Sequence, residues 1–266
     1  MDDASALTHI AAPGLDAAID RAAAALLKRQ RPDGHWVFEL EADATIPAEY
    51  VLLRAYLGEP DAPELEAKIG RYLRRIQADH GGWPLFHGGA LDVSCTVKAY
   101  FALKMIGDAP DAPHMVRARE ALLAHGGAGA CNVFTRLLLA LFGILDWRAT
   151  PEIPVEIMHL PRWFPIHLSK ISYWARTVIV PLLVLRALRP RARNPREVTI
   201  DELFLQPPAT LTDLPRGAHQ KEPWASLFFA LDKVLRVVRP HFPKASHASA
   251  IAKARAFVDE RLNGVD

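Results

Sequence analysis

A short pattern that occurs twice, Gln-x-x-x-Gly-x-Trp, constrains this chain more than any other feature. The first copy comprises Gln30, Gly34 and Trp36, and the second comprises Gln77, Gly81 and Trp83. The two glutamines, at positions 30 and 77, set a period of 47 residues. Before each copy, over residues 15–27 and 65–76, apolar side chains recur at the spacing of one helical face. The pattern therefore predicts a repeated helix that ends each time in the same turn.

The three residue types of the motif have complementary physical roles. Glycine ends a helix because it enters the left-handed conformation without a Cβ clash. A glutamine amide both donates and accepts, so it can join unpaired carbonyls at one helix end to amides of the next helix. An indole at a fixed distance covers the junction and buries a large apolar area. We expect a structural clamp between successive helices rather than a reaction centre.

The remaining pattern is also helical, and the predicted fold class is all-α. Helical pairs at this period favour a solenoid or a closed α/α barrel (toroid) of helical hairpins, because a single pair cannot bury its own apolar face. A third, eroded copy near residue 124 keeps the helix but lacks Gln and Trp, and the chain is expected to end inside a further repeat. Further helices are expected over residues 45–57, 91–106, 113–123, 132–142, 168–188, 224–238 and 249–262.

Composition excludes several classes of protein. A formal charge of +2 over 266 residues argues against a nucleic-acid binder. The only cysteines, Cys95 and Cys131, lack the spacing of a zinc site or a disulfide framework, so no metal is predicted and a reducing compartment fits best. The N-terminus does not look like a signal peptide, and the apolar run at 177–185 is too short to span a bilayer.

Two later segments suggest contact with a membrane. Five arginines between Arg186 and Arg196 precede a Pro-rich connection, residues 190–223, and are either a solvated helix end and loop or an anion-binding surface for lipid. Residues 224–238 predict an amphipathic helix, which would either lie in a bilayer interface or pack as ordinary core. Its apolar stripe holds Trp224, Leu227, Phe228, Leu231 and Leu235, and Lys221, Lys233, Arg236 and Arg239 flank it.

Motifs for hydrolysis, metal binding, phosphate binding and dinucleotide binding are absent from the sequence, so no catalytic residue and no cofactor is predicted. One interpretation is therefore a non-catalytic helical-repeat module that binds membranes or acts as a scaffold. An α/α-barrel glycosidase or a prenyltransferase subunit would need paired acids or zinc ligands that the pattern does not supply.

The repeated motif resembles the signature of the squalene and oxidosqualene cyclase family. Residues 132–136, 154–158, 161–165 and 172–176 are similar to the bacterial squalene–hopene cyclases, and the likeness covers essentially the whole chain. The resemblance implies a class II terpene cyclase, an isomerase or lyase of hopanoid biosynthesis, built of two α/α barrels. It would lie on the cytoplasmic side of the cell membrane as a monotopic protein, with a homodimer left open.

The resemblance also implies a mechanism and some of its residues. Such enzymes protonate squalene and guide the cation to hopene or hopanol in a pocket of aromatic rings, whose faces stabilise positive charge. By position, Phe134 and Trp174 resemble pocket-lining aromatics that bind substrate, the alternative being ordinary core aromatics. Residues 224–238 match the region of the membrane-inserted helix.

One departure limits the expected activity. The family's proton donor lies in an Asp-x-Asp-Asp motif in the C-terminal half, and this sequence contains no such motif. Family members are also more than twice this long. We therefore expect an N-terminal, incomplete α/α-barrel portion over residues 1–266, inactive alone, whose partners are squalene, a membrane surface and the C-terminal half of a cyclase.

Overall fold

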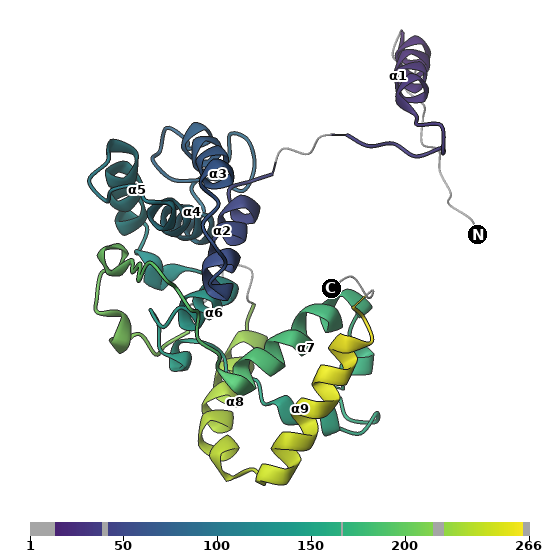
Figure 1. Ribbon diagram of the computed structural model, residues 1–266. Coiled ribbons are helices and arrows are strands. Elements are labelled where there is room, and N and C mark those ends of the chain that lie inside the picture. Colours follow the sequence, from purple (N-terminus) through teal and green to yellow (C-terminus); the bar gives the residue numbers. More distant parts are fainter. Residues whose placement is uncertain (1–13, 39–41, 166, 215–220, 263–266) are drawn as a thin grey trace, which may run out of the picture. The chain divides into compact units, whose positions relative to one another are not determined.

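The computed structural model describes residues 14–38, 42–165, 167–214 and 221–262, and the side chain of Trp224 lies outside this description. The chain divides into two units, Met1–Glu41 and Ala42–Asp266. Within the described ranges it is helical and has no β-strand, which confirms the predicted all-α class (Figure 1). The first unit holds α1 (Leu15–Arg29), which by itself buries no side chain.

The second unit carries the other α-helices. Their bounds are α2 (Thr45–Leu57), α3 (Pro63–Arg75), α4 (Val93–Ile106), α5 (Pro113–Ala124), α6 (Val133–Leu141), α7 (Tyr173–Leu188), α8 (Trp224–Val238) and α9 (Lys244–Asp259). The helices predicted at 45–57 and 224–238 are confirmed at both ends, and most of the others agree within two residues.

Two helices begin away from their predicted starts. The helix predicted from residue 168 begins at Tyr173, because the Ser172 hydroxyl accepts a hydrogen bond from the Ala175 amide (3.1 Å) and caps the helix there. Residues Leu168–Lys170 form a separate 3₁₀ turn. The helix predicted from Ser249 begins at Lys244 instead. Pro243, which directly precedes Lys244, therefore marks the start of the helix.

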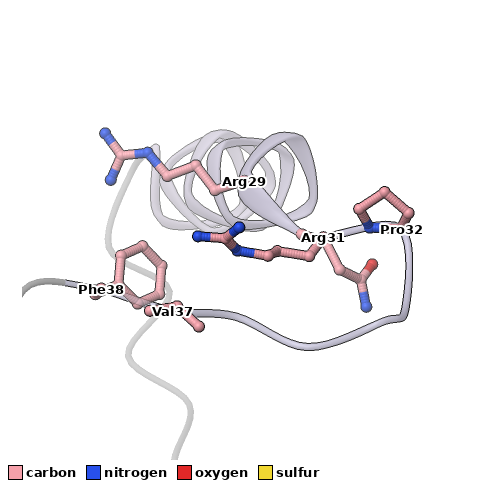
Figure 2. Close-up of a pocket in the computed structure, with 6 residues that line it drawn as sticks. Arg29, Arg31, Pro32, Val37 and Phe38 are labelled. Atoms are coloured by element: carbon pink, nitrogen blue, oxygen red, sulfur yellow. The ribbon is translucent and has the colours of Figure 1, made fainter.

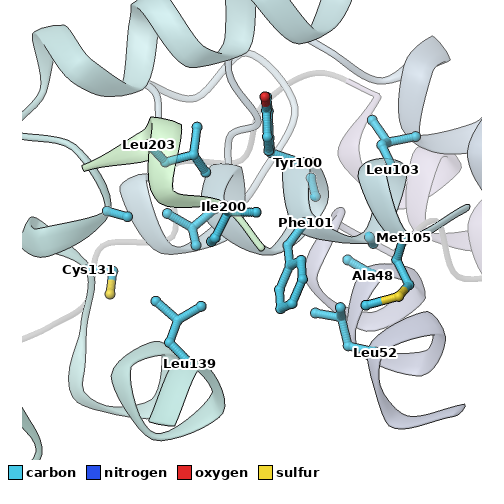
Figure 3. Packing of buried hydrophobic residues seen from close by; sticks show 14 of the residues in the cluster. Ala48, Leu52, Tyr100, Phe101, Leu103, Met105, Cys131, Leu139, Ile200 and Leu203 are labelled. Carbon is cyan, nitrogen blue, oxygen red and sulfur yellow. The ribbon is translucent and has the colours of Figure 1, made fainter. Parts of the chain in front are cut away.

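The larger core surrounds α4, which packs against α2, α3, α5 and α6. Figure 3 shows buried side chains of α2, α4 and α6 in this core. Leu52, Phe101 and Leu139 are fully buried there, and the ring of Phe101 meets that of Phe142 edge to face at 4.9 Å. Both cysteines are free and buried in this core, and burial raises the pKa of each thiol to about 12.

A smaller core joins α7, α9 and the 3₁₀ helix η3 (Val155–His159). It is built from Val180 and Leu183 on α7 and from Ala250 and Ala254 on α9, all fully buried. The small side chains of the two alanines let α7 and α9 pack closely, and η3 packs against both helices.

The Pro-rich connection is not a loose linker. Its residues Ile200 and Leu203 are fully buried in the larger core, and the backbone amides of Ala192 and Arg193 donate to carbonyls of α6 and α2. The interpretation of the preceding arginines as solvated is wrong for Arg186, which is 3% exposed. Residues 215–220 of the connection lie outside the described ranges.

Candidate functional site

The second copy of the motif closes the end of α3. The indole of Trp83 is 0% exposed, and its Nε1 donates to the Leu73 carbonyl in the last turn of that helix (2.8 Å). Gly81 has φ +89°, and a Cβ placed on it would lie 2.8 Å from the Arg117 carbonyl oxygen of α5. Both the left-handed backbone and this close approach therefore require glycine.

The Gln77 amide reaches from this turn to the next repeat. Its Nε2 donates to the carbonyls of Gly81 (2.6 Å) and His114 (2.8 Å), the latter in the first turn of α5. Its Oε1 accepts from the Arg117 guanidinium (2.9 Å). We expected the Gln77 amide to bind backbone amides of the next helix. Its Nε2 instead donates to a carbonyl of α5, and its single oxygen accepts from the long side chain of Arg117 in the same helix.

The first copy has the same internal hydrogen bonds in its own unit. Gln30 Nε2 donates to the Gly34 carbonyl (2.6 Å), and Trp36 Nε1 donates to Leu26 (2.7 Å). Trp36 is 43% exposed within this description. A shallow cavity of about 510 Å³ follows the turn and is lined by Arg29, Gln30, Arg31, Pro32, Val37 and Phe38 (Figure 2). The hydrogen bonds of the turn are thus local to the motif and occur in both copies. Burial of the indole is different, since Trp83 is buried and Trp36 is partly exposed in its own unit.

The two aromatics expected to bind substrate are on the surface of this chain. Phe134 and Trp174 lie in the first turns of α6 and α7 and are 55% and 78% exposed. Within this chain, neither side chain is part of a hydrophobic core. Within the described residues no ring contact joins them, so the chain presents them separately.

The α8 helix exposes most of its apolar side and half-buries Asp232 and Arg236 on the other side. Leu227, Phe228 and Leu231 are exposed, Val234 and Val238 extend the same face, and Leu235 is half-buried. This exposed α8 face comprises Leu227, Phe228, Leu231, Val234 and Val238. Ordinary core packing is thus excluded for most of the predicted stripe within this chain.

Charged side chains hold α8 in that orientation. The Asp232 carboxylate accepts from the Glu152 amide (2.6 Å) and pairs with Arg236 (2.6 Å). The Arg236 guanidinium also donates to the carbonyls of Arg148 and Thr150 (2.7 and 3.0 Å). Arg236 therefore anchors α8 to the segment that carries Arg148 and Thr150.

Glu152 is the centre of a buried charge cluster beside α8. Its carboxylate pairs with Arg186 of α7 (2.5 Å), whose side chain is 4% exposed, and with Arg239 (2.9 Å). Burial lowers the pKa of Arg186 to about 10; Glu152 opposes this shift, and Arg189, Arg239 and Arg236 add to it. The positive charge in this cluster exceeds what one carboxylate neutralises.

A second buried cation supports the start of α6. Arg136 is 2% exposed and donates to the carbonyls of Ala149 (3.0 Å), Asp213 (2.7 Å) and Gly129 (2.5 Å), and burial lowers its pKa. It fixes the helix that carries Phe134 to segments far away in the chain.

These ionic anchors were missed from the sequence. The Asp232 and Arg236 pair has the i, i+4 spacing that indicates an ion pair on a helix, so it could have been found. Glu152 and Arg186 carry no such signal, because they lie 34 residues apart and meet only through tertiary packing.

Comparison with known proteins decides the family. A model of the squalene–hopene cyclase N-terminal domain matches residues 19–266. The chain belongs to the squalene–hopene cyclase family. Relatives named squalene–hopene cyclase from Bradyrhizobium diazoefficiens and Zymomonas mobilis are 61% and 62% identical, over 95% and 93% of this chain. One from Alicyclobacillus acidocaldarius is 36% identical over 85% of it.

This family member spans about two fifths of the length of the more similar of these relatives, 38% and 37%. Among its described residues, no helix is both long enough and apolar enough to cross a membrane. Within the same ranges, no group of three or more His, Cys, Asp or Glu side chains is placed to hold a metal ion.

Proposed function

We propose that this chain forms one wall of the apolar chamber of a triterpene cyclase, which converts squalene to hopene or hopanol in hopanoid biosynthesis. The observation that carries the proposal is the family match over residues 19–266. In this proposal the helical hairpins close into an α/α toroid, and sequence outside this chain supplies the catalytic acid, because Asp-x-Asp-Asp does not occur here.

The exposed aromatics support a wall rather than a complete pocket. A carbocation in a hydrocarbon chamber needs stabilisation by groups that do not react with it, and an aromatic face offers this. Phe134 and Trp174 present such faces from helix starts fixed by Asn132 and Ser172, whose side chains cap α6 and α7. Their exposure is what a wall awaiting its opposite side requires.

Squalene turnover tests this proposal. The chain is assayed alone and mixed with a polypeptide corresponding to the remaining length of the Bradyrhizobium relative. Only the mixture is expected to produce cyclised triterpene. In the mixture, Trp174→Ala should lower turnover roughly tenfold, through loss of about 1–2 kcal/mol of cation–π stabilisation.

Trp163→Ala is the matched control, because Trp163 is exposed to a similar degree and its ring meets that of its neighbour Phe164 edge to face. Its turnover should change less than about twofold. Cyclisation by this chain alone would overturn the assignment of the acid to another segment. A stable but inactive complex would favour the non-catalytic scaffold.

For α8 we propose an interfacial role on the cytoplasmic surface of the cell membrane. The exposed α8 face is continuous over most of the helix, while hydrogen bonds from Asp232 and Arg236 to residues 148–152 hold the opposite side to the protein. An amphipathic helix in this orientation can bury its apolar side at the boundary between headgroups and acyl chains, from which squalene would also be drawn.

Two charges on the exposed α8 face should abolish this attachment. We expect Leu227→Asp with Phe228→Asp to lower the fraction of protein that co-sediments with liposomes at least about tenfold, because an ionised carboxylate resists transfer from water to lipid. Thermal unfolding should be nearly unchanged, since both side chains are exposed.

Leu205→Asp with Phe86→Asp makes the same chemical changes at exposed positions outside α8 and should leave sedimentation unaltered. Equal loss in both double variants would mean that general surface polarity, not α8, governs lipid binding. Unfolding of the α8 variant would assign its side chains to packing instead.

A further inference from the structure

A basic cavity of about 840 Å³ opens where α7, α8 and α9 meet the segment around Glu152. Two carboxylates line it, those of Glu152 and Glu156. Its six basic lining residues are Arg148, Arg186, Arg189, Arg236, Arg239 and Lys244. Asp146 pairs with Arg148 and Asp232 pairs with Arg236, so four carboxylates stand against the six basic groups and two positive charges remain in excess.

Three of the basic groups have donors for which the described residues supply no acceptor. The Nη1 of the buried Arg186 has no hydrogen-bond partner, although the rest of the guanidinium binds Glu152 and the Pro151 carbonyl. Among the described residues, neither the Arg189 guanidinium nor the Lys244 ammonium takes part in a hydrogen bond or an ion pair. A buried unpaired donor is costly unless something binds it.

Backbone features add to this positive field. Arg189 ends α7 in the left-handed conformation (φ +48°), which glycine adopts without strain and arginine does not. Arg189 lies at the rim of the cavity, where its exposed guanidinium adds positive charge. Lys244 begins α9, a helix with no side-chain cap, so its first-turn amides and helix dipole also favour an anion.

We propose that this cavity binds the phosphate group of an anionic phospholipid. The volume accommodates a lipid headgroup. Arg236 on α8 lines the cavity, so the helix that presents the exposed α8 face also borders the basic site. The choice of a lipid rests on the interfacial role proposed for α8; the choice of an anion rests on the cavity alone.

Calorimetric titration with a soluble lipid tests the site without a membrane. The probe is monomeric dihexanoyl phosphatidylglycerol, and dihexanoyl phosphatidylcholine, with the same chains and phosphate but a cationic headgroup, is the comparison. We expect the anionic lipid to bind at least about tenfold more tightly, because basic residues attract net negative charge. Arg189→Gln with Lys244→Gln should weaken its binding about tenfold or more.

Lys68→Gln with Arg71→Gln is the matched control, since it removes the same charge from exposed positions of α3. It should leave binding unchanged. Equal affinity for the two lipids, or equal weakening by both double variants, would overturn the proposal. Inorganic phosphate binding as tightly as the anionic lipid would make the cavity a simple ion site and also overturn it.

Two further arms separate the cavity from the other proposals. If the variant Leu227→Asp with Phe228→Asp binds both the soluble lipid and vesicles as well as the parent chain does, the proposal for α8 fails and the proposal for the cavity stands. If addition of the remaining cyclase polypeptide displaces the soluble lipid, the cavity receives an acidic protein segment instead, and the lipid assignment fails.

Discussion

Trp83→Ala is expected to lower the free energy of unfolding by about 3–5 kcal/mol, the usual cost of deleting a fully buried large aromatic. The Trp83 side chain is completely inaccessible, and the substitution removes both its packing and its hydrogen bond to Leu73. Urea unfolding at 25 °C, followed by circular dichroism, measures the change.

Two variants separate the contributions. Trp83→Phe keeps most of the apolar area and loses the indole donor, so it should cost about 1–2 kcal/mol. Trp36→Ala removes the same type of hydrogen bond from a half-exposed indole and should cost about 1 kcal/mol or less. If Trp83→Ala were as mild as Trp36→Ala, the second motif would not be a buried joint.

Glu152→Gln should be nearly as damaging, at about 3–5 kcal/mol, because it leaves buried guanidinium groups without a counter-charge. The side chains of Arg186 and Glu152 are 4% and 6% exposed, and Arg239 pairs with the same carboxylate. Thermal and urea unfolding of the variant, compared with the parent chain, measure the loss.

A double-mutant cycle with Arg186→Met identifies the origin of this loss. The double variant should be less destabilised than the sum of the single variants, since removing both charges leaves fewer of them unpaired. Glu260→Gln breaks an exposed pair with Arg261 and should cost less than about 1 kcal/mol. Additive losses in the cycle would show that the pair is not coupled.

The features that could be predicted from the sequence are those determined by nearby residues. The bounds of α8 follow from an apolar stripe between Pro223 and the pair Arg239-Pro240. The turn after each motif glutamine is also local, since Gln30 and Gln77 make the same bond to a carbonyl four residues on. Such contacts depend on a few backbone angles and therefore recur with the pattern.

The features that could not be predicted depend on segments that meet only after folding. Arg186 was predicted to be solvated because other arginines follow it in the sequence. In the structure it is buried and pairs with the Glu152 carboxylate. Arg136 looked like part of a family signature, and its carbonyl partners range from Gly129 to Asp213. Charge patterning along a chain does not reveal such partners, because pairing depends on tertiary proximity.

The ionic mooring of α8 has a consequence for handling the protein. Hydrogen bonds from Asp232 and Arg236 to residues 148–152 fix α8 to the protein, so its apolar side is exposed before any bilayer is encountered and binding requires no refolding. The same exposed apolar surface is unfavourable in aqueous buffer. The protein should therefore self-associate when detergent is removed and return to smaller species when detergent is added back.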